Sequence, residues 1–449
     1  MAGIAAAAPV RPWRRHRIAV DAIPVSAGPT PGSVPGLAPV SAPENGQRQR
    51  RRKRRKGRAV AKPANTETGI FLRNLRAPAK PAAPASFDPA RTLTAEAIAR
   101  QERPARPSAR TPAKIFAALD LGTNNCRLLL AVPTRPNRFR VVGAFSRIVR
   151  LGEGLTASGR LAAEAMDRAI EALQICATRL EAQPVAARRL IATEACRRAA
   201  NGAAFMERVE RETGLKLEII DRRTEAYLAA EGCGALIDRD ADGAVLFDIG
   251  GGSTEIALID RRRENGRGIS GKIAAWTSLP VGVVSLAERH GGQAVDRRTY
   301  NDMVEEVLAL IERFEQRAAL ARLWQDDRAH LLGTSGTVTT IAGVHLNLAR
   351  YDRRRVDGLW LTDSEVDAVI ARLLGMDYAQ RAANACIGSD RADLVLAGCA
   401  ILEAIRLTWP NPRLRVADRG LREGILSQLM RQHGAWNMPR HMRGRPGSG

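Results

Sequence analysis

The chain has 449 residues, of which 45% are hydrophobic, and this length allows two or three domains that each bury a sizeable core. Its formal net charge is +23, but residues 1–110 contain 22 Lys and Arg against 6 Asp and Glu, so the rest of the chain carries a surplus of only about 7. No apolar run reaches about 18 residues, which excludes a membrane-spanning helix. None of the six cysteines forms a CxxC pair, which argues against a structural zinc site. We therefore expect a cytoplasmic protein with reduced thiols and no membrane contact.

Residues 1–110 are rich in Pro, Ala and Arg and show no sustained hydrophobic periodicity. Such a segment buries too little apolar surface to offset the entropy of ordering, so we predict a disordered basic tail. The run RQRRRKRRKGR at 48–58 has two interpretations. It is either a solvated, self-repelling charged segment, or an arm that binds RNA, DNA or inorganic polyphosphate by releasing counterions. No aromatic residues lie within the run for base stacking, which argues against recognition of a nucleotide sequence.

Strand and helix patterns alternate from about residue 113 towards the end of the chain. Short apolar runs predict strands in KIFAALDLG at 114–122, RLLLAV at 127–132, FRVVGAF at 139–145, RLIAT at 189–193 and LEII at 217–220. Apolar residues that recur every three or four positions predict helix faces at Met166, Ile170, Leu173, Ala177 and Leu180, and again at Met303, Val307, Ile311 and Phe314. This alternation predicts an α/β protein with mixed sheets.

One internal repeat organises the chain: LDLGTNN begins at Leu119 and FDIGGGS begins at Phe247. Each motif is an apolar strand that ends in Asp-x-Gly, continues through small or polar residues and enters a second strand. Two such hairpins predict a duplicated domain with a cleft between the halves. We expect a first domain at 111–243, a second domain at 244–433 whose last helix returns to the first, and a flexible tail at 434–449.

The second repeat, VLFDIGGGSTEIAL at 245–258, has the composition of a phosphate site. Its three glycines lack a Cβ, so their backbone N–H groups can approach an anion, and the following Ser and Thr add hydroxyl donors. Asp248 and Glu255 frame the glycines and would repel phosphate unless a divalent cation lay between them. Mg²⁺ binds through one or two carboxylates plus phosphate oxygens, and Asp120 of the first repeat can face the same cleft. The competing interpretation is a plain glycine-rich hairpin turn.

Further motifs follow the hairpins in order. They are ATEACRRAANG at 192–202, LEIIDRRTEAYLAAEG at 217–232, LPVGVVSLAERHGG at 279–292, LLGTSGTVTTIAG at 331–343, RADLVLAGCAILEAI at 391–405 and VADRGLREGIL at 416–426. Together with the hairpins they resemble the exopolyphosphatase/guanosine pentaphosphate phosphohydrolase (Ppx/GppA) family over roughly residues 113–430. The resemblance implies two actin-like or sugar-kinase-like (ribonuclease H-like) domains with a central cleft. The chain departs from the family where Thr224 and Tyr227 stand in place of an acid and an arginine around the catalytic segment.

The resemblance implies roles for individual residues. Glu225 corresponds to the family's catalytic glutamate and would orient and deprotonate a water, while Arg197 would offer bidentate contacts to phosphate oxygens in the same site. Asp248 and Glu255 would hold Mg²⁺, with Asp120 assisting through water. The residues implied in phosphate binding are Thr123, Asn124, Gly250, Gly251, Gly252, Ser253 and Arg391. From position alone, Glu225 is as readily an exposed helix residue, and the two arginines are as readily members of surface ion pairs.

Two features of the second half have both a structural and a functional interpretation. The segment GTSG at 333–336 is either a third binding loop or a tight turn. Arg422 and Glu423 are expected to form a buried structural pair at a domain contact rather than a ligand site.

Three functions fit this sequence. The first is Mg²⁺-assisted hydrolysis that releases terminal phosphate from inorganic polyphosphate or guanosine pentaphosphate, since both present a terminal phosphoanhydride. The second is a kinase or ATPase of the same fold, although no adenosine-binding segment is evident. The third is a non-catalytic module that binds the alarmone and recruits RNA through its tail. An intact Glu225 with both acids of the second hairpin favours the hydrolase, and whether the protein forms a homodimer is left open.

Overall fold

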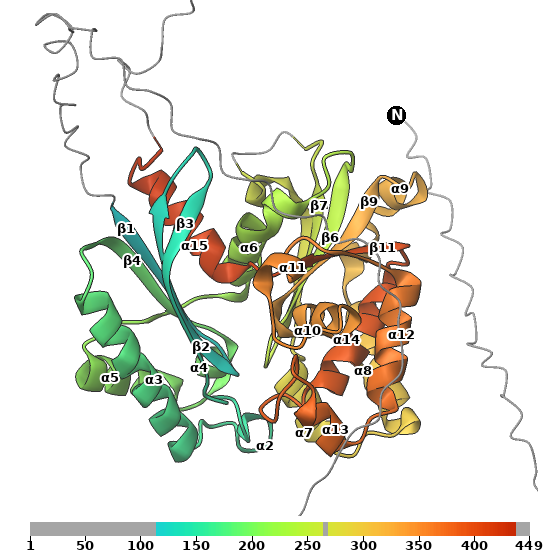
Figure 1. Cartoon of the computed structure of the whole chain (residues 1–449), viewed down its shortest axis with the longest axis horizontal. Coiled ribbons are helices and arrows are strands. Elements are labelled where there is room, and N and C mark those ends of the chain that lie inside the picture. Colours follow the sequence, from blue (N-terminus) through green and yellow to red (C-terminus); the bar gives the residue numbers. More distant parts are fainter. Residues whose placement is uncertain (1–113, 264–267, 437–449) are drawn as a thin grey trace, which may run out of the picture. The chain divides into compact units, whose positions relative to one another are not determined.

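The structure, a computed structural model, describes residues 114–263 and 268–436. Strands and helices alternate along these residues and form two mixed sheets with helices on their faces, which confirms the predicted α/β class (Figure 1). The tail predicted at 1–110 and residues 437–449 of the predicted C-terminal tail lie outside the described residues. We call the half built on the first sheet the first lobe and the half built on the second sheet the second lobe.

The first sheet has five strands in the order β3-β2-β1-β4-β5. They are β1 (Ile115–Leu121), β2 (Asn125–Pro133), β3 (Phe139–Ile148), β4 (Val185–Ala192) and β5 (Glu218–Ile219). Strands β1 to β3 form an antiparallel meander, while β4 is parallel to β1 and β5 is parallel to β4. The central strand β1 is apolar on both faces because helices cover both. Phe116 packs with α15 (Leu421–Gln432), whereas Leu119 packs with α3 (Ala163–Glu181).

The first lobe is completed by helices on the face of its sheet opposite α15. They are α3, α5 (Gly202–Thr213) and the short α2 (Leu155–Ser158) and α4 (Glu194–Arg198). The helix face predicted at 166–180 is the buried face of α3, where Ile170, Leu173 and Leu180 contact the sheet core. Apolar spacing therefore located this helix correctly.

The second sheet has six strands in the order β10-β11-β9-β6-β7-β8. They are β6 (Gly243–Ile249), β7 (Thr254–Asp260), β8 (Ile273–Leu279), β9 (Ala329–Thr334), β10 (Trp360–Thr362) and β11 (Arg413–Ala417). Strands β6 to β8 form an antiparallel meander, β9 is parallel to β6, and β11 is parallel to β9. This is the pairing pattern of the first sheet with β10 added at one edge, so the repeated motif reflects a repeated fold.

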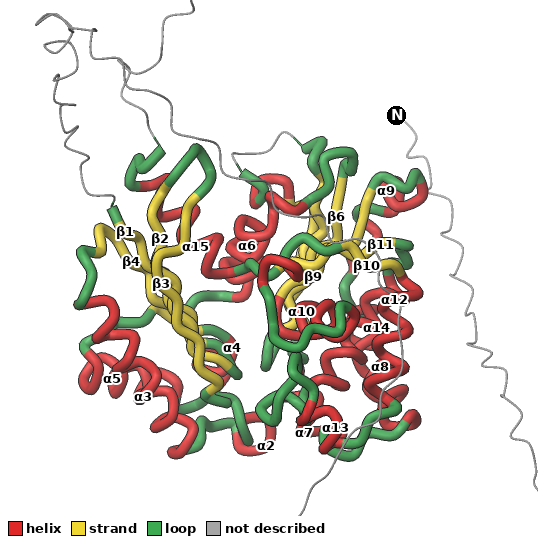
Figure 2. Tube along the Cα trace, viewed as in Figure 1, coloured by secondary structure: helices red, strands yellow, loops and turns green. Residues whose placement is uncertain are grey.

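Helices of the second lobe pack on one face of this sheet and form its main core (Figure 2). The longer ones are α7 (Val283–His290), α8 (Arg297–Glu312), α10 (Ser335–His345), α12 (Asp363–Leu374) and α14 (Val395–Thr408). Shorter helical segments are α9 (Ala321–Gln325), α11 (Arg353–Val356), α13 (Tyr378–Ala383) and η3 (Glu315–Ala318), while η1 (Gly234–Leu236) and η2 (Ser270–Lys272) lie beside α6 (Arg222–Cys233) on the other face. In α8, Met303, Val307 and Ile311 are buried, as their spacing predicted.

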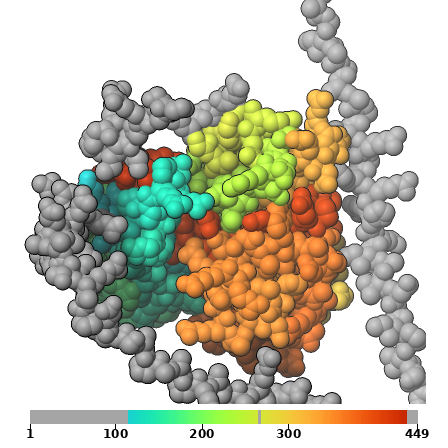
Figure 3. All heavy atoms as spheres, turned by 45° about the horizontal axis from the view of Figure 1, so that its top comes forward, coloured from blue at the N-terminus to red at the C-terminus, as the bar shows by residue number. Residues whose placement is uncertain are grey.

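Two helices connect the lobes and pack against each other between the sheets (Figure 1). Helix α6 (Arg222–Cys233) follows β5 and packs on the second sheet, whereas α15 follows β11 and packs on the first. Their crossing is close: a Cβ added at Gly424 would lie 2.0 Å from the carbonyl oxygen of Leu228. The red C-terminal segment is visible between the cyan and the yellow-to-orange surfaces in Figure 3.

None of the described helices is both long and apolar enough to cross a bilayer. All six cysteines lie within the described residues as buried free thiols. Beyond α15, the indole N–H of Trp436 donates to the carbonyl of Arg138 at 3.2 Å, so the chain stays against the first lobe up to this residue.

Candidate active site

A cavity of about 810 Å³ lies in the cleft between the lobes. Its volume is typical of sites for a nucleotide or another ligand of that size. It is lined by the turns of both repeated hairpins and by residues 334–337, 339–340, 385–391, 394–395 and 418–423. The predicted site residues that line it are Asp120, Thr123, Asn124, Glu225, Asp248, Gly250, Gly251, Gly252, Ser253, Glu255 and Arg391. Arg197 is the predicted residue that does not line it.

The two repeated hairpins carry different charges at corresponding positions. Asp120 on β1 lies directly opposite Arg127 on β2, and Asp248 on β6 lies directly opposite Glu255 on β7. Directly opposite residues of an antiparallel pair project from the same face of the sheet, with Cβ atoms about 5 Å apart. The first hairpin therefore presents a carboxylate beside a guanidinium, whereas the second presents two carboxylates. Arg127 is absent from the sequence-based prediction, although it follows Asp120 at the same spacing as Glu255 follows Asp248.

The glycine loop at 250–252 packs closely against the first phosphate loop at 122–125. A Cβ added at Gly251 would lie 3.0 Å from the Cβ of Thr123, and one added at Gly252 would lie 2.8 Å from Thr123 Oγ1. None of the three glycines has a positive φ. The close approach of the two loops therefore explains why positions 251 and 252 are glycine, whereas a Cβ added at Gly250 would lie 2.9 Å from the carbonyl oxygen of Ser253 within the turn itself.

The glycine loop is held so that several of its N–H groups remain free. The carbonyls of Gly250 and Gly251 accept hydrogen bonds from the N–H groups of Val283 and Val284 at the start of α7, at 2.9 and 2.8 Å. Among the described residues, nothing accepts a hydrogen bond from the N–H groups of residues 251–253. Adjacent free amides form a concave anion site. This arrangement suits a phosphate group.

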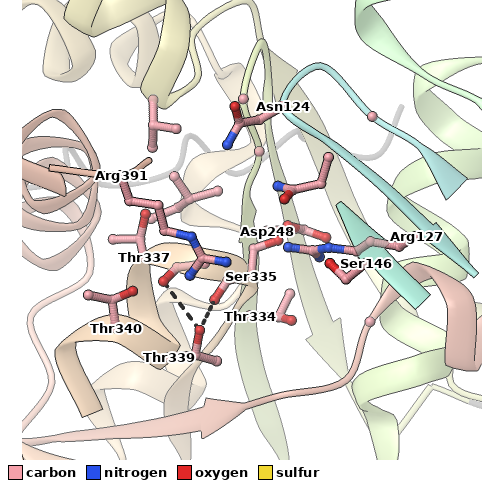
Figure 4. A pocket seen from close by; sticks show the side chains of 18 of the residues that line it. Asn124, Arg127, Ser146, Asp248, Thr334, Ser335, Thr337, Thr339, Thr340 and Arg391 are labelled. Carbon is pink, nitrogen blue, oxygen red and sulfur yellow. Dashed lines mark hydrogen bonds between the residues drawn. The ribbon is translucent and has the colours of Figure 1, made fainter. Parts of the chain in front are cut away.

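Residues from Thr334 to Thr340 contribute a third wall of the cavity, at the start of α10 (Figure 4). Ser335 has a φ of 76°, which is strained for a residue with a Cβ and is typical of functional sites. Thr339 Oγ1 donates to the carbonyl of Ser335 at 2.9 Å. Figure 4 shows the guanidinium of Arg391 extending towards this wall. The position of this wall in the cavity supports the interpretation of the GTSG segment as a binding loop rather than a plain turn.

Four carboxylates around the cavity, the buried Glu255 and the partly buried Asp120, Glu225 and Asp248, have raised pKa values. Desolvation by burial is the largest cause and raises the pKa of Asp120 to about 6 and that of Glu255 to about 7. Burial also raises the pKa of Asp248 and, together with repulsion from Glu255, that of Glu225. Carboxylates in such surroundings bind a proton or a nearby cation more readily than exposed ones.

Glu225 lies in the first turn of α6, and Arg197 holds its carboxylate. Arg197 Nη2 donates to Glu225 Oε2 at 3.0 Å and to Glu194 Oε2 at 2.7 Å, and Nη1 donates to the carbonyl of Ile220. Glu194 is buried and is also paired with Arg222. Arg197 therefore orients Glu225 from outside the cavity, which differs from the phosphate contact that we expected of it.

Three arginines that line the cavity form no ion pair with any carboxylate of the described residues: Arg127, Arg391 and Arg422. Glu423 was expected to pair with Arg422 but instead accepts a hydrogen bond from Arg353 Nη2 at 2.9 Å. Arg422 is thus a cavity residue rather than half of a structural pair. Unpaired guanidinium groups around a cavity suit a ligand with several phosphate groups.

The donors around the cavity fit Mg²⁺ that is held jointly with a phosphate ligand. No three His, Cys, Asp or Glu side chains within 114–263 and 268–436 are grouped as a metal site. Mg²⁺, however, commonly binds one or two carboxylates together with phosphate oxygens and waters. Asp248 and Glu255 supply such a pair on adjacent strands. The buried side-chain oxygen of Asn124, which has no hydrogen-bond partner, adds a further oxygen in the same cavity.

Comparison with known proteins places the chain among phosphatases. The model of the Ppx/GppA phosphatase family matches residues 132–433. The chain is 30% identical over 333 residues to exopolyphosphatase 2 of Mycobacterium tuberculosis, which covers 70% of this chain and 98% of that protein. It is 26% identical over 329 residues to the guanosine-5'-triphosphate,3'-diphosphate pyrophosphatase of Photobacterium profundum, which covers 70% of this chain and 59% of that protein.

Solved structures show the same fold. The crystal structure of an exopolyphosphatase-like protein is 28% identical with a TM-score of 0.62, covering 71% of this chain and 99% of that one. A Ppx/GppA family member from Aquifex aeolicus is 27% identical with a TM-score of 0.55, covering 72% of this chain and 99% of that one. These matches confirm the two actin-like lobes and the family that the sequence motifs predicted. The chain belongs to the Ppx/GppA phosphatase family.

Proposed function

We propose that this protein is a phosphohydrolase that releases the terminal phosphate of inorganic polyphosphate or of guanosine pentaphosphate. The observation that carries this proposal is the position of Glu225. Its partly buried carboxylate lines the same cavity as the free amides of the glycine loop and the three unpaired arginines. A proton acceptor, amide donors and guanidinium groups around one cavity are the parts needed for attack of water on a phosphoanhydride. The activities in the names of the two relatives support the same substrate class.

In this mechanism the terminal phosphate binds to the free N–H groups of the glycine loop and to Thr123 of the opposing loop. Arg127 and Arg391 neutralise charge on the phosphate groups that follow. Glu225 accepts a proton from a water that lies in line with the breaking P–O bond, and orthophosphate is released. Burial raises the pKa of Glu225 and so makes its ionised carboxylate a stronger base, while Arg197 keeps that carboxylate in place.

Asp248 and Glu255 would hold Mg²⁺, with Asp120 as a more distant partner through water. When bound, the ion supplies charge neutralisation on the phosphate oxygens. A carboxylate must be ionised to hold the ion, so Mg²⁺ competes with the proton at Glu255, whose pKa is about 7. We therefore expect the Mg²⁺ requirement to increase as the pH falls below 7.

The test replaces Glu225 by glutamine, which keeps the size of the side chain and removes the base. Phosphate release from polyphosphate and from guanosine pentaphosphate is measured side by side with Mg²⁺ present. We expect kcat to fall roughly 10²–10⁴-fold on whichever substrate the parent cleaves, with little change in KM. Glu231→Gln on the same helix is the matched control, because Glu231 bonds Ser270 and Arg431 outside the cavity. A kcat within about twofold of the parent would reject Glu225 as the base.

The same assay separates the alternative functions. Release of phosphate from ATP alone would favour the ATPase interpretation, and binding of guanosine pentaphosphate without turnover would favour the alarmone-binding module. For the basic run at 48–58 we propose a contact with a long polyanion, which would add affinity without entering the cavity.

A further inference from the structure

Arg150 and Asp393 form an ion pair that joins the two lobes beside the cavity. Arg150 follows β3 in the first lobe, and Asp393 precedes α14 in the second. Nη1 lies 2.9 Å from Asp393 Oδ2 and Nη2 lies 3.0 Å from Oδ1, and Nη2 also donates to the carbonyl of Asp390 at 3.0 Å. The two side chains are only 30% and 19% exposed. A bidentate, partly desolvated pair stabilises its contact more than an ordinary surface ion pair does.

On the first-lobe side, the backbone around Arg150 supports the first phosphate loop. The N–H groups of Val149 and Arg150 both donate to the carbonyl of Asn124, at 2.9 and 3.1 Å, and the N–H of Gly152 donates to the carbonyl of Thr123 at 2.9 Å. Arg150 has a φ of 47°, which is strained for a residue with a Cβ and persists where the surroundings hold it. One end of the ion pair is therefore attached directly to the loop that carries Thr123 and Asn124.

On the second-lobe side, Asp393 lies two residues after Arg391 in a tightly held segment. The buried Arg381 donates from Nε to the carbonyl of Ala392 at 3.2 Å, and its other nitrogens donate to two further carbonyls. A Cβ added at Gly292 would lie 2.1 Å from the carbonyl oxygen of Asp393, so the segment has no room to shift in that direction. A movement of Asp393 therefore carries Arg391 with it.

A second link between the lobes runs beside the first, where α2 and α7 approach each other in Figure 1. The N–H of Gly154 donates to Glu288 Oε1 at 2.8 Å. Glu288 belongs to α7, and the first two N–H groups of this helix hold the carbonyls of the glycine loop. Each link thus connects the first lobe to an element of the second lobe that supports phosphate-binding residues.

We propose that the Arg150–Asp393 pair is a clamp that fixes Asn124 of the first lobe relative to Arg391 of the second, so that both contact the same chain of phosphate groups. Figure 4 shows these two side chains on the walls of one cavity. Neither Arg150 nor Asp393 lines the cavity, so both are positioning residues that act through their neighbours. This inference rests on the proposed function, because it assigns Asn124 and Arg391 to one polyphosphate ligand.

Loss of the clamp shifts the free protein towards a more open cleft. The apparent dissociation constant of the substrate then increases in inverse proportion to the fraction of closed protein. A saturating substrate restores closure, because it contacts both lobes. The defect should therefore appear in KM, whereas loss of a group that touches the reacting phosphate would also lower kcat.

The kinetic test uses the full-length protein with Arg150→Asn, Asp393→Asn and both changes together. Asparagine tolerates the positive φ at residue 150, so the backbone of the turn is retained. We expect each single change to lower kcat/KM for polyphosphate about tenfold through KM, and the double variant to lose about tenfold rather than a hundredfold, since one interaction is removed in all three. Arg208→Gln is the matched control, because Arg208 pairs with Asp167 within the first lobe and should leave both constants unchanged.

The second measurement does not depend on activity. Nitroxide labels at Gln174→Cys on α3 and Glu305→Cys on α8 report the distance between the lobes, and the six native cysteines are buried away from the label. Without substrate, the clamp variants should give longer and broader distances than the parent and Arg208→Gln. Longer distances in an inactive protein would reject the proposed function and retain the clamp. An active protein whose clamp variants match Arg208→Gln in both kcat/KM and distance would overturn the clamp and retain the function.

Discussion

Replacement of Glu255 by glutamine should stabilise the protein at alkaline pH. Burial, with added repulsion from Asp248, raises the pKa of Glu255 from 4.5 to about 7. The folded state therefore binds this proton more tightly than the unfolded state does, so the free energy of unfolding falls as the pH rises from 4.5 to about 7 and changes no further above it. At about 1.4 kcal/mol per pKa unit, the ionised carboxylate costs about 3 kcal/mol at pH 8. Glutamine is neutral throughout and still accepts the hydrogen bond from Ser278.

The assay is thermal unfolding at pH 5 and pH 8 in buffer without divalent metal. For a core of roughly 320 residues, 3 kcal/mol corresponds to about 5 °C. We expect Glu255→Gln to unfold about 5 °C above the parent at pH 8 and only about 1 °C above it at pH 5. The control is Glu171→Gln, which alters an exposed carboxylate and should change Tm equally at both pH values. A Tm difference for Glu255→Gln that does not depend on pH would refute the raised pKa.

Three further changes test other parts of the molecule. Asp248→Asn should raise the Mg²⁺ concentration needed for half-maximal phosphate release, because it removes an anionic oxygen, and an unchanged Mg²⁺ titration would assign Asp248 another role. Gly424→Ala should lower the free energy of unfolding in urea by about 3 kcal/mol, since the new Cβ would lie 2.0 Å from the carbonyl of Leu228, and wild-type stability would contradict the close crossing of α6 and α15. Deletion of residues 1–110 should leave hydrolysis of a short substrate unchanged, but it should weaken the binding of long polyphosphate and RNA and make that binding less dependent on salt. Equal affinities and equal salt slopes for the full-length and truncated proteins would show that the tail is inert.

Sequence reasoning identified most of the predicted residues that line the cavity through local patterns. The two Asp-x-Gly hairpins are short, continuous motifs, so their strands and turns could be identified without knowledge of the tertiary structure. Their turns line one cavity, as the repeat suggested. Glu225 depended on the family resemblance, because nothing in its immediate neighbours distinguishes it from an exposed helix glutamate. The sequence therefore predicted the local structure of the hairpins and the residue types in the cavity better than the contacts between those residues.

Contacts between distant segments could not be predicted, and Arg422 shows why. Arg422 and Glu423 are adjacent in the first turn of α15, and adjacent helix residues do not face each other. Both residues line the cavity, but Glu423 accepts hydrogen bonds from the N–H of Gly420 and from Arg353, whereas Arg422 forms no ion pair with any carboxylate of the described residues. Arg197 is a similar case, since its direction depends on the buried Glu194. The requirement for glycine at 251 and 252 likewise depends on a loop that lies more than a hundred residues away in the sequence.

The different charges of Arg127 and Glu255 explain how one duplicated hairpin serves two purposes in the same cleft. A second pair of acids in the first hairpin would have placed four aligned carboxylates around a polyanion, and one cation could not have neutralised them. Arg127 instead offsets part of the charge of Asp120 without forming an ion pair with it, and leaves the first lobe able to contact phosphate directly. The acid pair of the second lobe is then free for a metal ion. On this view the lobes have separate tasks, so a device that fixes their separation, such as the Arg150–Asp393 pair, is required for both to act on one substrate.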